Sequence, residues 1–83
     1  MNITLPDWYD DLTELECKSK GCAINFNVVI NGVDMLFNFY DITRFTQDAM
    51  DEIADSGYFK DVDAVILSEV TKNNIVIYLN LLS

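Results

Sequence analysis

An α+β fold is predicted for this 83-residue chain by three patterns in its sequence. Two alternating apolar runs flank an Asn-Gly dipeptide, which is typical of a tight β-hairpin. Two other stretches repeat apolar residues at helical spacing, and two runs near the end are rich in the β-branched and aromatic residues that favour strands. We therefore expect a single domain, residues 1–83, with the order α-β-β-α-β-β and two helices packed on a four-stranded, mainly antiparallel sheet.

The first helix is expected over residues 5–18. Thr4 is a residue type that caps helices, and Pro6 fits a first turn, where its missing N–H is not needed. Gly21 can end the helix in the left-handed conformation that other residues adopt poorly. Helical spacing predicts that one apolar stripe faces the core, and its members are Leu5, Trp8, Leu12 and Leu15.

The hairpin is expected over residues 23–40, with Asn31 and Gly32 as its turn. A two-residue turn fixes the register of the strands, because it decides which residues lie opposite each other. The predicted pairs on the apolar face are Ile30 with Val33, Val28 with Met35, Phe26 with Phe37, and Ile24 with Phe39. The reverse face is mixed in polarity, so we expect it to be partly exposed.

A second helix is expected from Thr46 to Gly57, with an earlier start at Asp41 or Thr43 left open. Thr46 can cap the helix, and Gly57 can end it. One side of this helix is apolar and is expected to face the core; it consists of Phe45, Ala49, Met50, Ile53 and Ala54. The other side is almost entirely acidic.

The last two runs, 62–70 and 75–82, are read as strands joined by a turn at 71–74. They are nearly continuous in apolar residues, which is typical of strands covered on both faces. Two helices cover only one face of a four-stranded sheet, so apolar side chains are expected to be exposed on the other face. A second copy of the chain or a partner protein could cover them.

The net charge of the chain limits the classes of molecule that it is expected to bind. The chain has 14 acidic and 5 basic residues and a formal net charge of −9. Such a field repels the phosphates of nucleic acids and the head groups of anionic lipids, and it attracts basic protein surfaces. We therefore expect no direct binding to nucleic acid or membranes. Solubility alone is the alternative explanation of the charge.

Catalytic and metal-binding patterns are not found in the sequence. The chain has no histidine, which removes the commonest general base and the commonest metal ligand. Cys17 and Cys22 lack further ligands for a zinc ion and are expected to be free thiols. We therefore predict no catalytic, cofactor or metal site, and a protein that is not an enzyme. No signal sequence or long apolar run is seen, so a cytoplasmic location is expected.

Two hypotheses for function remain. The first is a small acidic inhibitor that presents carboxylates to a basic surface of a nucleic-acid-acting protein. Immunity proteins and phage-encoded anti-defence inhibitors are similar to it in size and charge. Its predicted contact residues are Asp10, Asp11, Glu14, Asp48, Asp51, Glu52 and Asp55. The alternative is a structural or adaptor module that forms a homodimer or binds a partner through Leu36, Tyr40 and Tyr78 on the outer sheet face.

Overall fold

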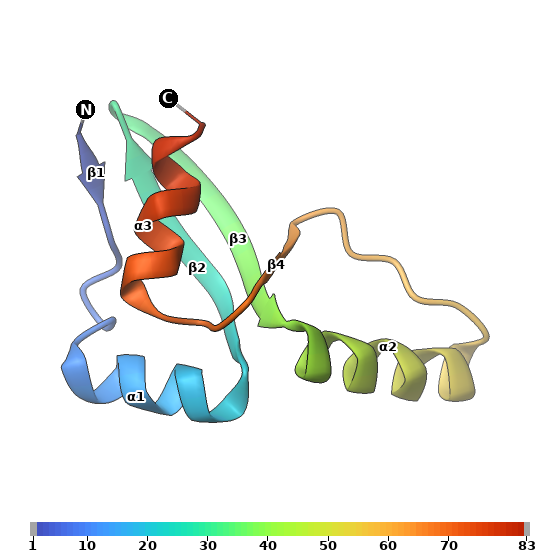
Figure 1. The fold of residues 1–83 in the computed structure, drawn as a ribbon. Helices are drawn as coiled ribbons and strands as arrows, with labels where there is room; N and C mark the ends of the chain where they lie inside the picture. The colour runs from blue at the N-terminus through green and yellow to red at the C-terminus, as the bar shows by residue number, and fades with distance from the viewer. Residues whose placement is uncertain (1, 83) are drawn as a thin grey trace.

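The computed structural model describes residues 2–82 and shows four strands and three helices in this range (Figure 1). The elements, in chain order, are β1 (Ile3–Thr4), α1 (Asp11–Lys20), β2 (Cys22–Ile30), β3 (Val33–Asp41), α2 (Ile42–Ser56), β4 (Ala64–Leu67) and α3 (Lys72–Asn80). The chain is thus α+β as predicted, although it has one helix more than expected.

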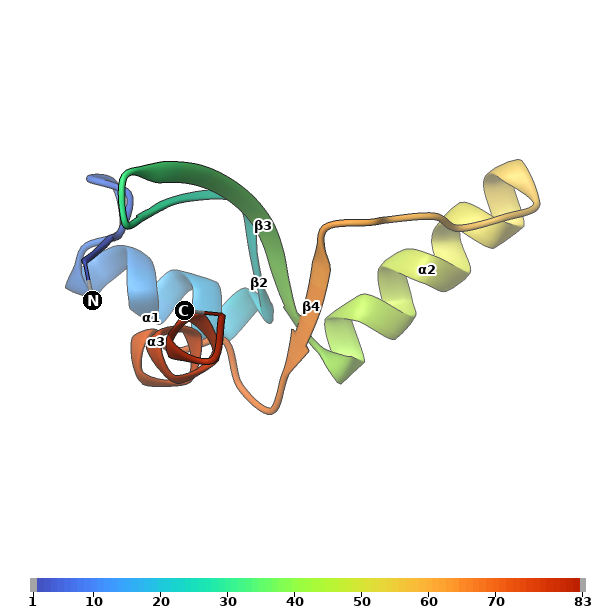
Figure 2. The same ribbon diagram turned by 90° about the horizontal axis from the view of Figure 1, so that it is seen from above.

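The sheet has the strand order β1-β2-β3-β4. Antiparallel pairing joins β1 to β2 and β2 to β3, whereas β3 and β4 run parallel, so the sheet is mixed. Helices α1 and α3 lie on the same face of the sheet, and the opposite face is left open by both (Figures 1 and 2). This arrangement places the core on one side of the sheet only.

The core lies between the sheet and helices α1 and α3. Phe26, Val28 and Phe39 are completely buried and contribute from the two long strands. Ile75 and Leu79, one helical turn apart on α3, are also fully buried against this face. Helix α1 contributes one buried residue, Cys17, to the same cluster. The alternating hairpin pattern is confirmed only in part. Phe26, Val28, Ile30, Phe37 and Phe39 are in the core as predicted, whereas Ile24, Val33 and Met35 are exposed, and Ala23, predicted on the reverse face, is buried.

The predicted hairpin register is confirmed near the turn and fails at the far end. Pairing runs from Ile30 with Val33 to Phe26 with Phe37, as expected. Farther on, Phe39 pairs with Ala23 rather than with Ile24, because a β-bulge inserts one extra residue between Ala23 and Phe26. Asn25, at a positive φ of 54°, takes up the distortion, and asparagine tolerates this conformation better than most residues.

Helix α1 begins later than expected, at Asp11 instead of residue 5. Asp10 caps it by accepting a hydrogen bond of 2.8 Å from the backbone N–H of Thr13. The segment before the helix extends along the sheet, where Ile3 pairs with Ile30. The helix ends at Gly21, as predicted, with φ at 75°.

The predicted inward stripe of this helix is wrong in part. Leu12 and Leu15 are 67% and 65% exposed, and Trp8 is also exposed, whereas Leu5 packs against the core. Cys17 is instead the buried residue of α1. Leu5 and Trp8 lie before the helix, so they do not share a helix face with Leu12 and Leu15. The side of α1 that faces the core is the one with Cys17, which is turned about 200° from Leu15.

The second predicted hairpin is wrong. Residues 64–67 form β4, which pairs parallel with β3, and residues 72–80 form helix α3 rather than a strand. Thr71 caps α3 through a 3.2 Å hydrogen bond from the N–H of Asn74. Packing of Ile75 and Leu79 at helical spacing outweighs the strand preference of the β-branched residues in this segment.

Helix α2 begins at the earlier of the starts left open. Asp41 is its N-cap and accepts a 2.7 Å hydrogen bond from the N–H of Arg44. Gly57 ends the helix with φ at 86°, as predicted. Because α2 connects two parallel neighbouring strands, it is a crossover helix, and such helices normally pack back onto the sheet. Here α2 projects away from the sheet (Figure 2).

The projecting helix makes the molecule elongated. Its dimensions are 41 × 25 × 20 Å, and its radius of gyration is 13.3 Å, whereas a compact chain of this length has about 12 Å. The accessible surface is 5458 Å², against about 5,000 Å² for a compact monomer of this mass. We call residues 42–63, which comprise α2 and the segment that returns to β4, the α2 arm.

Candidate protein-binding surface

Local chemistry explains why α2 forms although it lies outside the core. Asp41 and Gly57 cap its two ends. Arg44 and Asp48, one turn apart, form an ion pair with an Nε to Oδ1 distance of 2.9 Å. This contact raises the pKa of Arg44. No residue of α2 is buried, so these local interactions have to supply much of its stability.

The arm is attached to the rest of the molecule at the start of α2. Arg44 donates a hydrogen bond of 3.2 Å from Nη1 to the backbone carbonyl of Lys20, the last residue of α1. Three aromatic rings pack edge to face in a row: Tyr40 on β3 contacts Phe45 on α2, and Phe45 contacts Phe59 on the returning segment. These contacts hold both sides of the arm together near its base.

A second attachment lies where the arm returns to the sheet. The carboxylate of Asp61 accepts hydrogen bonds from Nδ2 of Asn38 at 3.3 Å and from the hydroxyl of Tyr40 at 3.4 Å. It also accepts one from the N–H of Asp63 at 3.0 Å. Burial, followed by the charge of Asp61, raises the pKa of the Tyr40 hydroxyl. Asp61 therefore has a structural role in fastening the arm to β3.

Three large apolar side chains of α2 are exposed on one side of the helix. Ile42 is 63% exposed, Met50 64% and Ile53 51%. The aromatic row covers only the neighbouring side, where Phe45 and Ala49 are half-buried. The sequence pattern assigned Met50 and Ile53 to the core, so their exposure was missed. The sequence pattern does predict that α2 has an apolar side. It does not predict whether that side packs on the sheet of the same chain, because this depends on the tertiary structure.

Most of the carboxylates on the acidic side of α2 have no partner among the described residues. Asp51, Glu52 and Asp55 are exposed, and their carboxylates make no hydrogen bond or ion pair with any residue in the range 2–82. Asp48, also predicted as a contact residue, is paired with Arg44. Three of the four predicted acids on this helix are thus available to an external partner.

The predicted acids of α1 are used mainly within the chain. Asp10 caps its own helix, and the hydrogen bond from Thr13 lowers the pKa of its carboxyl. Glu14 accepts a 2.7 Å hydrogen bond from the N–H of Lys72 and so caps α3. Asp11 is exposed and has no such contact among the described residues. We conclude that Asp10 and Glu14 have structural roles that the sequence pattern did not reveal.

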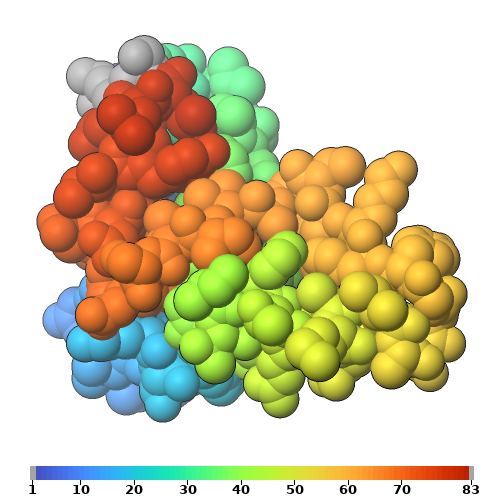
Figure 3. Space-filling model, turned by 45° about the vertical axis from the view of Figure 1, so that its right-hand side comes forward, coloured from blue at the N-terminus to red at the C-terminus, as the bar shows by residue number. Residues whose placement is uncertain are grey.

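The acids of the two helices do not form one continuous surface. Helices α1 and α2 follow one another along the same side of the molecule (Figures 1 and 3). Three basic residues lie where the helices meet: Lys18 and Lys20 in the last turn of α1, and Arg44 in the first turn of α2. Lys18 is also paired with Glu69 at 3.4 Å. The predicted acidic site is therefore divided, and its freest part is on the arm.

The three predicted apolar contact residues do not share one face. Leu36 is exposed, and it alternates with the buried Phe37 along β3, which places it on the sheet face opposite the core. Tyr40 is only 6% exposed, because Phe45 covers it. Tyr78 lies on α3 and packs against Phe37 and Phe39 on the core side of the sheet. Their role in partner binding stays a prediction, and only Leu36 presents a large surface to solvent.

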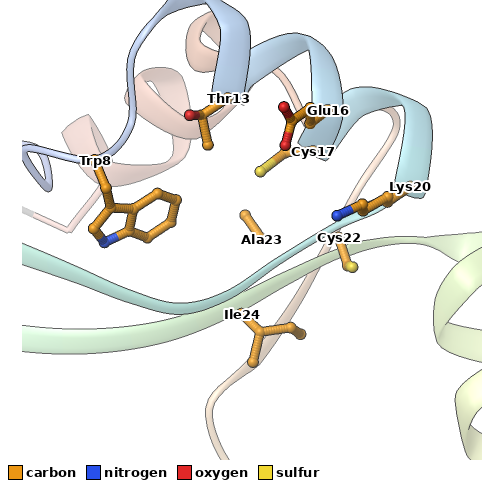
Figure 4. A pocket seen from close by; sticks show the side chains of 8 residues that line it. All are labelled: Trp8, Thr13, Glu16, Cys17, Lys20, Cys22, Ala23 and Ile24. Carbon is orange, nitrogen blue, oxygen red and sulfur yellow. The ribbon is translucent and has the colours of Figure 1, made fainter.

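A cavity of about 270 Å³ lies between α1 and the start of β2 (Figure 4). Its lining residues are Trp8, Thr13, Glu16, Cys17, Lys20, Cys22, Ala23 and Ile24. The side chain of Cys17 points from α1 toward Ala23, whereas that of Cys22 points away from the helix. Both thiols are free and buried, and burial raises the pKa of Cys17. A thiol of this kind is a poor nucleophile near neutral pH.

We also looked for a metal-binding group, for a helix that could span a membrane, and for similarity to known proteins. Among residues 2–82, no group of three or more acidic, histidine or cysteine side chains is arranged to hold a metal ion. No helix in the same range has the length and apolar character needed to cross a membrane. Comparison of the chain with protein-family models, curated proteins and solved structures finds no match.

Proposed function

We propose that the chain is a non-catalytic inhibitor that binds a basic surface on a protein acting on nucleic acid, with the α2 arm as the main contact. The observation that supports this proposal is the set of free carboxylates of Asp51, Glu52 and Asp55 on a helix that projects from the molecule. Carboxylates held on a projecting helix can approach a concave site that the rest of the molecule is too wide to enter.

Electrostatics favours this class of partner over others. Surfaces that hold nucleic acid are rich in lysine and arginine, and a chain with a net charge of −9 is attracted to them at raised rates. Asp51 and Asp55 are four residues apart, which is about 6 Å along a helix axis. Two steps along one DNA strand advance about 7 Å. The axial spacing of this pair of carboxylates is therefore similar to that of every second phosphate along one DNA strand.

The proposal assigns different roles to the predicted acids. Asp51, Glu52 and Asp55 contact the partner, with Asp48 beside them and partly neutralised by Arg44. Asp11 can add a contact from α1, whereas Asp10 and Glu14 serve mainly to cap helices. The protein acts in the cytoplasm and needs no cofactor in this proposal.

A charge-reversal experiment tests the role of the arm. The tagged chain and two triple variants are used to capture proteins from the native host, which are then identified by mass spectrometry. The arm variant carries D51K, E52K and D55K; the control variant carries D7K, E16K and D34K at exposed positions elsewhere. Each triple variant has a net charge of −3, because three residues change from −1 to +1.

We expect one basic, nucleic-acid-acting protein to bind the unchanged chain and the control variant, and the arm variant to bind it at least tenfold more weakly. Binding should also weaken steeply as the salt concentration rises, because exposed charges are screened. A captured partner that is neutral or acidic, or that binds the arm variant as tightly as the control, would contradict the proposal.

A further inference from the structure

The apolar side of α2 has no partner within the molecule, and it is separate from the acidic side. Ile42, Thr46, Met50 and Ile53 follow one another at intervals of three or four residues, so they form a stripe along the helix. The exposed residues at one border of this stripe are Thr43, Gln47 and Ala54, all uncharged; at the other border lie Ser56 and one acid, Glu52. With about 100° of rotation per residue, Asp51 and Asp55 lie on the other side of the helix.

We propose that this stripe pairs with the same stripe of a second copy of the chain, as an antiparallel two-helix contact related by a two-fold axis. A two-fold contact requires a self-complementary surface. With the axis between Gln47 and Asp48, Ile42 lies level with Ile53 of the other copy, and Thr46 lies level with Ala49. Apolar or small side chains thus meet throughout the seam.

The charges of α2 are compatible with this register. Asp51 lies level with Arg44 of the other copy, and Glu52 lies level with Thr43, so no acidic residue of the helix is placed level with another. Asp51 and Arg44 both lie on the side of the helix away from the stripe, and Arg44 keeps its ion pair with Asp48. The positive N-terminus of each helix also lies beside the negative C-terminus of the other. Two chains that each carry −9 can therefore pair here with Asp51 and Asp55 turned outward. A basic partner would instead be attracted to the acidic side, which is why a second copy fits the stripe better.

The size of the contact sets the expected strength. A helix of 15 residues is about 22 Å long. A seam of that length buries less than the roughly 800 Å² per subunit of a standard interface. We therefore expect a weak dimer that becomes measurable between about 5 and about 500 µM. This inference does not depend on the proposed function, since the acidic side stays exposed in the dimer.

Sedimentation equilibrium of the purified chain, from about 5 to about 500 µM, tests the inference. The key variant is I53D, and I77D is its matched control, because Ile53 on α2 and Ile77 on α3 are 51% and 53% exposed. We expect a monomer–dimer equilibrium for the unchanged chain and for I77D, and at least tenfold weaker pairing for I53D. Raising the NaCl concentration should not weaken the dimer, because the seam is apolar.

Circular dichroism confirms that each variant remains folded, and M50K serves as a second seam variant if I53D does not. An unchanged chain that stays monomeric at 500 µM would overturn the inference. Equal pairing by I53D and I77D would do so as well. Because the capture experiment probes the acidic side and this one probes the apolar side, either proposal can fail without the other.

Discussion

At the residue scale, Gly21 is the glycine with the least freedom to change. It ends α1 with a positive φ of 75°, and its carbonyl accepts a hydrogen bond from the N–H of Asp41. A Cβ placed there would lie 2.5 Å from Oδ2 of Asp41, which caps α2. One glycine therefore lets the end of α1 approach the start of α2 closely.

We expect Gly21→Ala to destabilise the protein by about 2–4 kcal/mol, since it combines left-handed strain with a steric clash at the α2 cap. Gly57→Ala is the matched control, because Gly57 has a similar φ of 86° but no atom within 4 Å of the position that a Cβ would occupy. Gly57→Ala should lower the free energy of unfolding by only about 1 kcal/mol. Urea denaturation of both variants measures the difference, and equal costs would show that the contact with Asp41 is unimportant.

Tyr9 is a second residue whose surroundings are unusual. Its hydroxyl is buried and has no hydrogen-bond partner among residues 2–82. Burial raises the pKa of this hydroxyl, and the charge of Glu14 adds to the effect. A buried polar group without a partner costs free energy, because it has lost its hydrogen bonds to water.

We therefore expect Tyr9→Phe to be neutral or to stabilise the protein by about 1 kcal/mol, as measured by denaturation at pH 7. The raised pKa also predicts that the stability of the unchanged chain falls as the pH rises above about 10, the pKa of tyrosine in an unfolded chain. The Phe variant should lack this part of the fall. A loss of more than about 1 kcal/mol at pH 7 would instead indicate a hidden hydrogen bond.

At the scale of elements, α2 and α3 differ in what stabilises them. Helix α3 buries Ile75 and Leu79 completely in the core, and its N-terminus is capped by Thr71 and Glu14. Helix α2 buries no residue, and it depends on its own caps, its internal ion pair and the contact of Phe45 with the returning segment. The two helices should therefore open independently.

Hydrogen exchange followed by NMR can measure this difference. We expect the amides of α2 to exchange through a local opening that is at least about 2 kcal/mol easier than global unfolding, and the amides of α3 near Ile75 to need global unfolding. Phe59→Ala should lower the protection of α2 further and leave that of α3 unchanged. Equal protection of the two helices in the unchanged chain at micromolar concentration would contradict the independence of the arm.

At the scale of the whole molecule, the sheet divides the apolar residues between a one-sided core and several exposed positions. The core lies under α1 and α3, while the exposed large apolar residues include Leu12, Leu36, Met50, Ile53 and Leu81. Scattered exposed residues are normal on a protein surface. Those of α2 differ because they are aligned on an element that projects, and the acidic side of the same helix faces elsewhere.

This separation lets one helix serve two contacts. In the proposals made above, the apolar side of α2 pairs with a second copy, and the acidic side of each copy faces a basic partner. A dimer would then present two acidic helices about a common axis. A partner that is itself a two-fold dimer could bind both, which would strengthen the complex without any new kind of contact.

Features that depend on neighbouring residues could be predicted from the sequence alone. The turn at Asn31–Gly32 and the register next to it were predicted correctly, because a two-residue turn admits few geometries. The ends of α1 and α2 at Gly21 and Gly57 followed from the need for a positive φ. The acidity of α2 was also visible, because it depends only on composition and helical spacing.

Which surfaces meet is settled by the tertiary fold. Residues 75–80 have strand preference but become helical, because Ile75 and Leu79 fit the core at a spacing of four. The bulge at Asn25 shifts the end of the hairpin, and Glu14 turns from a surface acid into the cap of α3. These outcomes, like the exposure of the α2 stripe, depend on contacts between distant residues, whose free energies outweigh the small preferences of local sequence.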